Sequence, residues 1–371
     1  MTSTISNRKE RIVSSNEAAI DRLRKAYKSH NLTLFLGAGV SVANGLPTWE
    51  RLVLAMYFST IGVSQLGGWR PFPNYLFAIA EWHLKRLREP LEITARKLRK
   101  YYKSGEEFMT ELKKTLYAGF RFDESARFLP MDRQQIRGAN STLNAITELC
   151  ETDLSENCGV RAVITYNYDN LLEIALGHCP YEVIWRAGPR RTDKLPIYHV
   201  HGFVPIGEQE GSHDEELLFT EEQYNRASHD PYSWSNLIQI ELMAGSLGLM
   251  IGLSMTDRNM RRLLDAVQKA PVKTQHYALL KEPSWEEPGD KELDEINGNA
   301  LSYFERFARS GGSVPGTKGE RFAEEIRGIL RQVERQDKEQ QGYILRQLGV
   351  EPIWYRDHAE VAAIIRKIGE A

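Results

Sequence analysis

The feature that most constrains the fold is a series of short apolar runs that alternate with segments of helical periodicity. An apolar run of about four to eight residues bounded by turn residues is typical of a strand buried on both faces. Strands that alternate with helices are joined by crossover connections, which makes their sheet parallel. The pattern therefore predicts an α/β fold with a doubly wound, Rossmann-like parallel sheet. The predicted strands are 32–36, 162–165, 181–185, 197–200, 247–251, 276–280 and 353–355.

Two long segments interrupt this alternation. Residues 50–158 show only helical periodicity, and residues 284–347 are rich in charge, Gly and Pro. We therefore predict one domain, 1–371, in which a sheet carries a helical insertion and a second charged, mainly helical insertion. The sheet takes about 31–49, 160–283 and 348–371. Helices are also predicted at 15–30 (with a Ser14–Glu17 capping box), from an N-cap at Thr48, and at 170–176, 234–243, 257–268, 320–341 and 359–368.

The composition excludes several classes of protein. With 42% hydrophobic and 26% charged residues, the chain of 371 residues is neither disordered nor fibrous. A net charge of −2 argues against a strongly basic nucleic-acid coat. Three cysteines, Cys150, Cys158 and Cys179, cannot form a four-cysteine zinc site, so we expect no metal. The N-terminus lacks an apolar signal core, and the second half of the uncharged stretch 52–69 is too polar to lie in lipid. We expect a cytoplasmic protein without a membrane segment.

A basic run lies within the predicted helical insertion. Eight Lys and Arg residues fall between Lys85 and Lys103. Such a run is usually a helix face exposed to solvent. The alternative is that it binds an acidic partner or nucleic acid. Nothing else in the sequence supports direct contact with nucleic acid.

A glycine-rich turn follows the first predicted strand directly. In Gly37-Ala38-Gly39-Val40-Ser41, glycines would let backbone N–H groups approach a phosphate. The alternative is a tight turn without a ligand. A dehydrogenase fingerprint does not fit, because the third glycine is replaced by Val42 and no acidic residue occurs between Glu50 and Glu81.

Further polar and glycine-containing groups follow other strands or the same turn. Open parallel sheets bind ligands at the carboxyl ends of their strands, so groups at several ends predict a ligand site there. These groups are Gly45-Leu-Pro47, Thr165-Tyr-Asn167-Tyr-Asp169, His199-Val-His201-Gly202 and Gly252-Leu-Ser254.

In their order and spacing, these motifs resemble the sirtuin superfamily. The nearest resemblance is to bacterial sirtuin-like proteins that hydrolyse NAD in anti-phage defence. It includes Asn167-Tyr-Asp-Asn-Leu-Leu-Glu173 and Gly252-Leu-Ser-Met-Thr-Asp257. Protein deacylases of the superfamily differ, because they have Asp-Phe-Arg where this chain has Thr48-Trp49-Glu50, and they usually carry a zinc module of two CxxC pairs.

The resemblance implies an NAD glycohydrolase that cleaves NAD to nicotinamide and ADP-ribose. It would deplete NAD as the effector of an anti-phage, abortive-infection system, with NAD as substrate and no zinc. One alternative is an NAD-dependent protein deacylase or ADP-ribosyltransferase. Another is a non-catalytic module that senses NAD or ADP-ribose and recruits a partner.

Two residues are predicted to be catalytic. Asn167 can orient the ribose and a water, or serve only as a turn residue, and His201 titrates near neutrality and can take a proton. Strand alternation puts His199 on the same face as His201, so only Gly202 and the family pattern favour His201. Asp169 either binds the carboxamide of the nicotinamide or caps the helix that follows it. Ser254 either contacts NAD or caps the helix that begins near Asp257. The predicted NAD-binding residues are Gly37, Ala38, Gly39, Ser41, Pro47, Thr48, Asp169, Gly252 and Ser254.

An unregulated NAD hydrolase would poison its own cell, so we expect an inactive state. Control by homo-oligomerisation, or by a partner protein encoded nearby such as a HerA-type ATPase or another sensor, would supply it.

Overall fold

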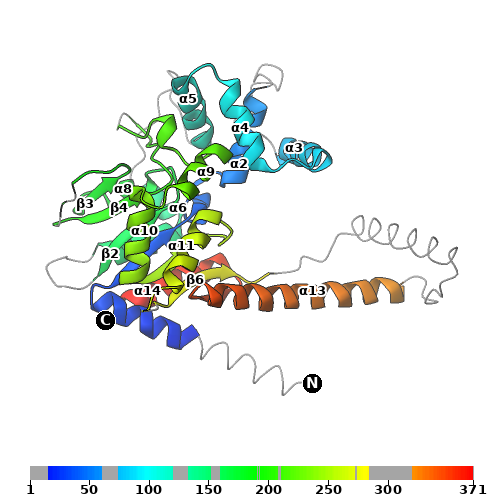
Figure 1. Ribbon diagram of the computed structural model, residues 1–371. Helices are drawn as coiled ribbons and strands as arrows, with labels where there is room; N and C mark the ends of the chain where they lie inside the picture. The colour runs from blue at the N-terminus through cyan, green and yellow to red at the C-terminus, as the bar shows by residue number, and fades with distance from the viewer. Residues whose placement is uncertain are drawn as a thin grey trace. The chain divides into compact units, whose positions relative to one another are not determined.

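The computed structural model describes residues 16–60, 74–119, 133–151, 159–189, 191, 193–207, 210–271, 274–283 and 320–370. These residues fall into two compact units, one within 1–280 together with 347–371, and one within 281–346. Figure 1 shows the elements of both units along the chain. Each unit is described by itself.

A seven-stranded sheet forms the centre of the first unit. Its strands are parallel and confirm the predicted α/β fold, in the spatial order β3-β4-β2-β1-β5-β6-β7. Each of the seven predicted strands is present within a few residues of its expected bounds. They are β1 (Leu32–Leu36), β2 (Val160–Thr165), β3 (Tyr181–Ile184), β4 (Leu195–His199), β5 (Leu247–Ile251), β6 (His276–Lys281) and β7 (Val350–Tyr355).

The register of the central strands brings four carboxyl ends side by side. Leu36 of β1 pairs with Thr165 of β2 and with Ile251 of β5, and Thr165 in turn pairs with His199 of β4. The strand order reverses direction across β1 and β5, and such a switch point is where open α/β sheets bind ligands. The fold therefore places four of the sequence motifs at one edge.

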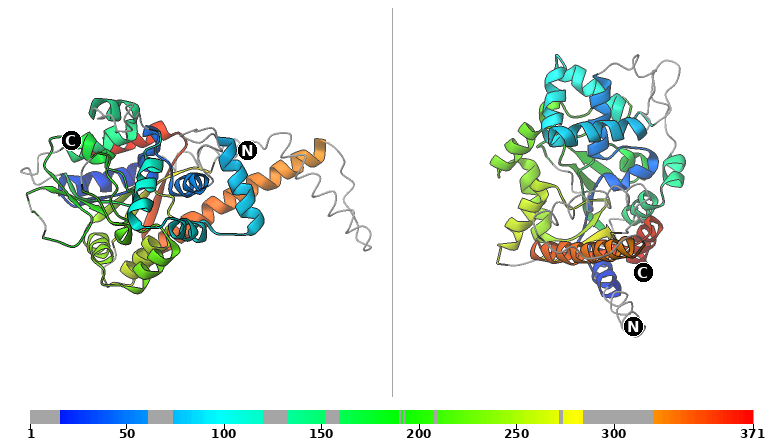
Figure 2. Two further views of the ribbon diagram at one scale, coloured as in Figure 1. Left: turned by 90° about the horizontal axis from the view of Figure 1, so that it is seen from above. Right: turned by 90° about the vertical axis from the view of Figure 1, so that its right-hand side faces the viewer.

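Helices cover both faces of the sheet. The helices α7 and α14 pack together, as do α10 and α11, and Figure 2 shows these two pairs on opposite sides of the strands. Helix α8 lies with α6 and α7. The bounds are α6 (Arg133–Ala139), α7 (Ser141–Cys150), α8 (Leu171–Leu176), α9 (Glu221–His229), α10 (Trp234–Gly245), α11 (Arg258–Gln268) and α14 (His358–Gly369). Residues 16–28 are also helical, whereas Ser14 of the predicted capping box lies outside the described residues.

Between β1 and β2, the described residues contain helices and no strand, as the periodicity predicts. The first of these helices begins after Thr48, whose Oγ1 accepts the N–H of Arg51 at 3.4 Å. Helix α2 packs with α3, α4 and α5, and Figure 1 shows them grouped together. Their bounds are α2 (Trp49–Ser59), α3 (Asn74–Leu87), α4 (Leu91–Tyr101) and α5 (Gly105–Leu116).

The basic run on α3 and α4 is partly engaged in ion pairs. Arg96 pairs with Glu222 at 2.6 Å, and the guanidinium of Arg99 contacts Asp214. These cations thus connect the helical insertion to the segment around α9, rather than forming a wholly solvated face.

The second unit contains α13 (Glu320–Gln347), which confirms the helix expected at 320–341. Lys338 pairs with Glu282 at 2.6 Å, and Ile329 and Val333 are exposed on this helix. The remainder of the second predicted insertion, 284–319, lies outside the described residues. Among the residues that the structure describes, no helix is both long and apolar enough to cross a membrane.

Candidate functional site

The glycine turn after β1 is tied to the loop after β5. The N–H of Gly37 donates to the carbonyl of Ile251 at 2.9 Å, and the N–H of Gly39 donates to the carbonyl of Gly252 at 3.0 Å. Gly252 has a φ of 67°, and a Cβ there would lie 2.6 Å from the nitrogen of Val40. Glycine is therefore needed because two backbones approach closely.

This turn offers an anion fewer free donors than the sequence predicts. The N–H of Val40 donates to the carbonyl of Gly37, and that of Ser41 donates to the carbonyl of Ala38. With the two bonds to the β5 loop, four of the five N–H groups of 37–41 are already used inside the chain. Residues 38–40 and 42–44 form two short 3-10 turns, and the α-helix that follows this turn begins only at Trp49.

Asn167 links β2 to the glycine turn. Its Nδ2 donates to the carbonyl of Gly37 at 3.1 Å and to Oγ of Ser41 at 3.2 Å, and its own N–H donates to Oγ1 of Thr165. The amide group is thus held by its nitrogen end. Such an arrangement leaves the side-chain oxygen available to accept a hydrogen bond from a ribose hydroxyl or a water.

Asp169 is held from both of its oxygens. Oδ2 accepts from Oγ of Ser41 at 2.9 Å, and Oδ1 accepts from the N–H of Leu171 at the start of α8. Burial raises the pKa of this carboxyl to about 6, against the effect of these two hydrogen bonds. Asp169 thus contacts the start of α8, whose N-cap residue is Asn170, and its binding of the nicotinamide carboxamide stays a prediction.

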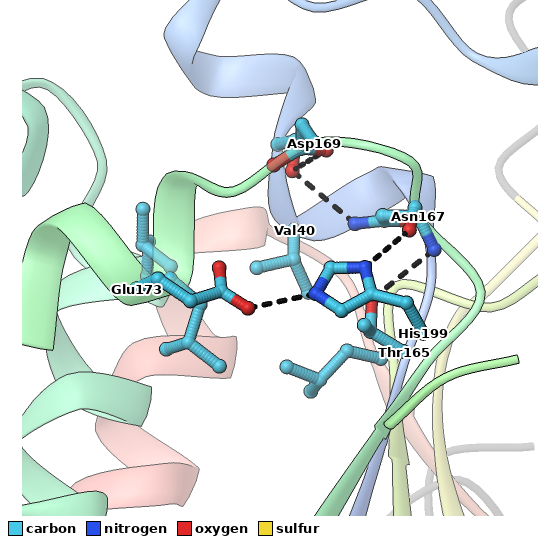
Figure 3. A pocket seen from close by; sticks show the side chains of 10 residues that line it. Val40, Thr165, Asn167, Asp169, Glu173 and His199 are labelled. Atoms are coloured by element: carbon cyan, nitrogen blue, oxygen red, sulfur yellow. Dashed lines mark hydrogen bonds and ion pairs between the residues drawn. The ribbon is translucent and has the colours of Figure 1, made fainter. Parts of the chain in front are cut away.

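His199 and Glu173 form a buried pair beside Asn167. Nε2 of His199 lies 2.7 Å from Oε1 of Glu173, and Nδ1 lies 3.1 Å from the carbonyl oxygen of Asn167. The carbonyl oxygen of Asn167 can only accept, so Nδ1 of His199 donates to it, while Nε2 and the carboxyl of Glu173 share the second hydrogen bond. Figure 3 shows this pair with Asn167 and Asp169 around a small cavity with room for about one water molecule.

Glu173 lies in the site, although the sequence analysis gave it no role of its own. It belongs to the quoted Asn167–Glu173 motif, but no role was predicted for it. The signal that could have found it is an acid on a short helix whose other residues are apolar, Leu-Leu-Glu-Ile-Ala-Leu. A charged residue that is 4% exposed needs a partner, and His199 supplies it.

We expect the substitution His199→Ala to lower the free energy of unfolding by about 3–5 kcal/mol, because it leaves the buried carboxyl of Glu173 without its partner. Urea unfolding measured against the unchanged protein gives this value. The double variant His199→Ala/Glu173→Leu, which removes the unpaired acid, should recover part of the loss. If His199→Ala lowers the free energy of unfolding by less than about 1 kcal/mol, it behaves like a substitution at an exposed position. That result would contradict a buried pair.

His201 occupies a different environment from His199, so the expectation that both share one face is wrong. Strand β4 ends at His199, and the chain then turns through Gly202, whose φ is 104°. Side-chain alternation therefore stops before His201. The ring of His201 lies edge-on to Tyr166 and Tyr224, with centroids 4.9 and 5.9 Å apart.

One ring nitrogen of His201 is buried without a hydrogen-bond partner. This atom is Nε2, and the nearest acidic oxygen is Oδ2 of Asp257 at 3.9 Å. Burial lowers the pKa of His201 below its usual value of 6.5, and the charge of Asp257 opposes this shift. The ring is therefore neutral at pH 7 and can accept a proton.

Some of the predicted site residues have described contacts elsewhere, and not with Asn167, His199 or His201. Thr48 caps α2, and Ser254 is exposed with its Oγ 2.7 Å from Oγ1 of Thr256. The expectation that Ser254 might otherwise cap the next helix is wrong, because Asp257 is the N-cap of α11 and accepts from the N–H of Met260. Pro47 has no backbone N–H to donate to a ligand.

Within the described ranges, no group of three or more His, Cys, Asp or Glu side chains could hold a metal ion. Cys150 and Cys179 are free thiols, and Cys158 lies outside those ranges. The candidate site is thus made of an anchored amide, a buried base and several carboxylates.

The glycine turn and the anchored Asn167 lie at the switch point of the sheet, where open α/β sheets bind ligands. Residues 161–303 match the model of the SIR2-like domain family. This supports a place in the sirtuin-like superfamily and points to an NAD-utilising enzyme. The match includes Asn167, Asp169, His201 and Gly252, whereas the turn at Gly37 lies outside it. No curated protein matches the sequence.

Proposed function

We propose that this protein is an NAD glycohydrolase, which releases nicotinamide and leaves ADP-ribose. The observation that carries the proposal is the buried, neutral ring of His201, whose Nε2 has no hydrogen-bond partner. Asn167, whose amide is oriented by two hydrogen bonds, follows a neighbouring strand of the same sheet. Binding alone needs no base, so a buried histidine that is free to take a proton favours a reaction over a sensing module.

The reaction would pass through an oxocarbenium-like state at C1′ of the nicotinamide ribose. The bond between C1′ and the nicotinamide nitrogen breaks, and its electron pair stays on that nitrogen. A water oxygen then bonds to C1′ while one water proton passes to His201 and from there to solvent. Asn167, anchored to Gly37 and Ser41, would hold the ribose and this water in line.

Deacylation is less well supported. The chain has Thr48-Trp49-Glu50 where deacylases have Asp-Phe-Arg, and its three cysteines cannot form a four-cysteine zinc module. Neither difference removes Asn167 or His201, the two residues that we propose cleave NAD.

Nicotinamide release from NAD, measured by chromatography with and without an acetyl-lysine peptide, tests the proposal. We expect release without peptide, together with one free ADP-ribose for each nicotinamide. Strict dependence on the peptide would favour a deacylase, and ADP-ribose attached to protein would favour a transferase. Saturable NAD binding without turnover, in the isolated protein and in its assemblies, would favour a sensing module.

We further propose that the activity depletes NAD in anti-phage defence and is controlled by assembly, either of identical copies or with a partner encoded nearby. An effector of this kind should be active only in the assembled or triggered state. A purified monomer with full activity, unchanged on assembly, would argue against such control.

A further inference from the structure

The buried nitrogen of His201 has an acidic neighbour with a second role. Asp257 presents two oxygens from the beginning of α11. Oδ1 accepts the N–H of Met260 at 2.7 Å and caps the helix, while Oδ2 faces Nε2 of His201 at 3.9 Å. The carboxylate also interacts with the hydroxyl of Tyr224, whose pKa it helps to raise. One residue thus connects the end of a helix with the candidate base.

Among the described residues, Asp257 is the only acidic side chain within ion-pair distance of the His201 ring. Its other described ring contacts are the edges of Tyr166 and Tyr224, which are uncharged at neutral pH because burial raises their pKa. Glu92 acts on Tyr224 from α4 and has Arg258 at 3.8 Å.

We propose that Asp257 is a positioning residue for His201, an inference that rests on the proposed function. Oδ2 of Asp257 accepts the Nε2–H of the ring, so that Nδ1 takes the proton in the reaction. A carboxylate behind a catalytic histidine fixes the tautomer and stabilises the imidazolium that forms. The 3.9 Å separation is longer than a hydrogen bond, as is common before substrate binds, and it would shorten once the ring is charged.

One substitution can remove the charge of Asp257 and keep the cap of α11. Asp257→Asn keeps the shape of the side chain and an oxygen for the N–H of Met260, and Asn is as good an N-cap as Asp. It removes the charge that faces His201. Asp265→Asn is the matched control, because Asp265 is an exposed acid on the same helix and pairs only with the neighbouring Lys269 in the described structure.

Two measurements then test the role. In nicotinamide release, Asp257→Asn should lower kcat on the order of 100-fold with KM unchanged, because a misplaced base slows the chemical step and leaves NAD binding intact. The acidic limb of the pH profile should move to lower pH. Without the opposing charge of Asp257, burial alone acts on His201 and lowers its pKa further. Asp265→Asn should match the unchanged protein in both respects.

The second measurement is independent of activity. NMR titration of the histidine rings, with the His201 signal assigned through His201→Gln, should show its pKa fall in Asp257→Asn and stay constant in Asp265→Asn. If the unchanged protein does not cleave NAD but this pKa falls, the proposed function fails while the pairing stands. An unchanged His201 pKa in Asp257→Asn would overturn the pairing whatever the activity, and a change in KM alone would make Asp257 an NAD contact instead.

Discussion

The variant His201→Ala should lose about 100- to 10,000-fold of the nicotinamide release, since a positioned acid–base group commonly contributes that much. NAD binding should remain close to that of the unchanged protein, because the ring's described contacts are with Tyr166, Tyr224 and Asp257 and none is with the glycine turn. Turnover by chromatography and NAD affinity by calorimetry, at matched folded concentrations, give the two values.

The control for this result is another histidine. His229 is exposed on α9 and hydrogen-bonds only to the carbonyl of Asn225 among the described residues, so His229→Ala should keep full activity. The rival assignment is tested with His199→Gln, which retains a polar group toward Glu173. Near-normal turnover in His201→Ala, with activity lost in His199→Gln, would show that His199 is the base.

The variant Asn167→Ala should show a comparable loss, on the order of 100-fold or more, because a small misplacement of the reacting groups is costly. The physical reason is its anchoring: two hydrogen bonds, to the carbonyl of Gly37 and to Oγ of Ser41, fix the amide at the end of β2. Removing the side chain removes both the polar group and its orientation. Single-turnover nicotinamide release separates this chemical defect from any change in NAD binding.

Ser41→Ala serves as the graded comparison for Asn167. It removes one of the two anchors and keeps the amide itself, so its loss of activity should be smaller than that of Asn167→Ala. Thermal unfolding of both variants checks that they fold. A larger loss in Ser41→Ala than in Asn167→Ala would mean that the hydroxyl, rather than the amide, holds the substrate.

Most of the fold could be predicted from the sequence because its signals are local. A strand such as β1, Leu-Thr-Leu-Phe-Leu, is apolar on both faces, and that pattern is visible without knowledge of its neighbours. The same is true of the N-cap Thr48, whose bond to Arg51 spans three residues. The alignment of the strand ends followed from the parallel sheet alone.

The site was harder to predict because its contacts are set by tertiary geometry. The turn through Gly202 separates His201 from His199, and the close approach of Gly252 consumes donors that the glycine turn was expected to offer. Asp257 and His201 face each other from the N-cap of α11 and from the turn after β4, which no spacing rule connects. Whether the predicted NAD-binding residues contact NAD stays a prediction.

The central place of β1 has a consequence for how the protein is made. This strand is synthesised first, yet its two neighbours in the sheet begin only at Val160 and Leu247. At about 5–20 residues per second, roughly 210 residues of translation keep the second edge of β1 open for about 10–40 s. Leu32, Leu34 and Phe35 are fully buried in the finished sheet, so during this time the nascent chain exposes an apolar strand edge that other chains can pair with. Slower translation of residues 37–247 would prolong that exposure.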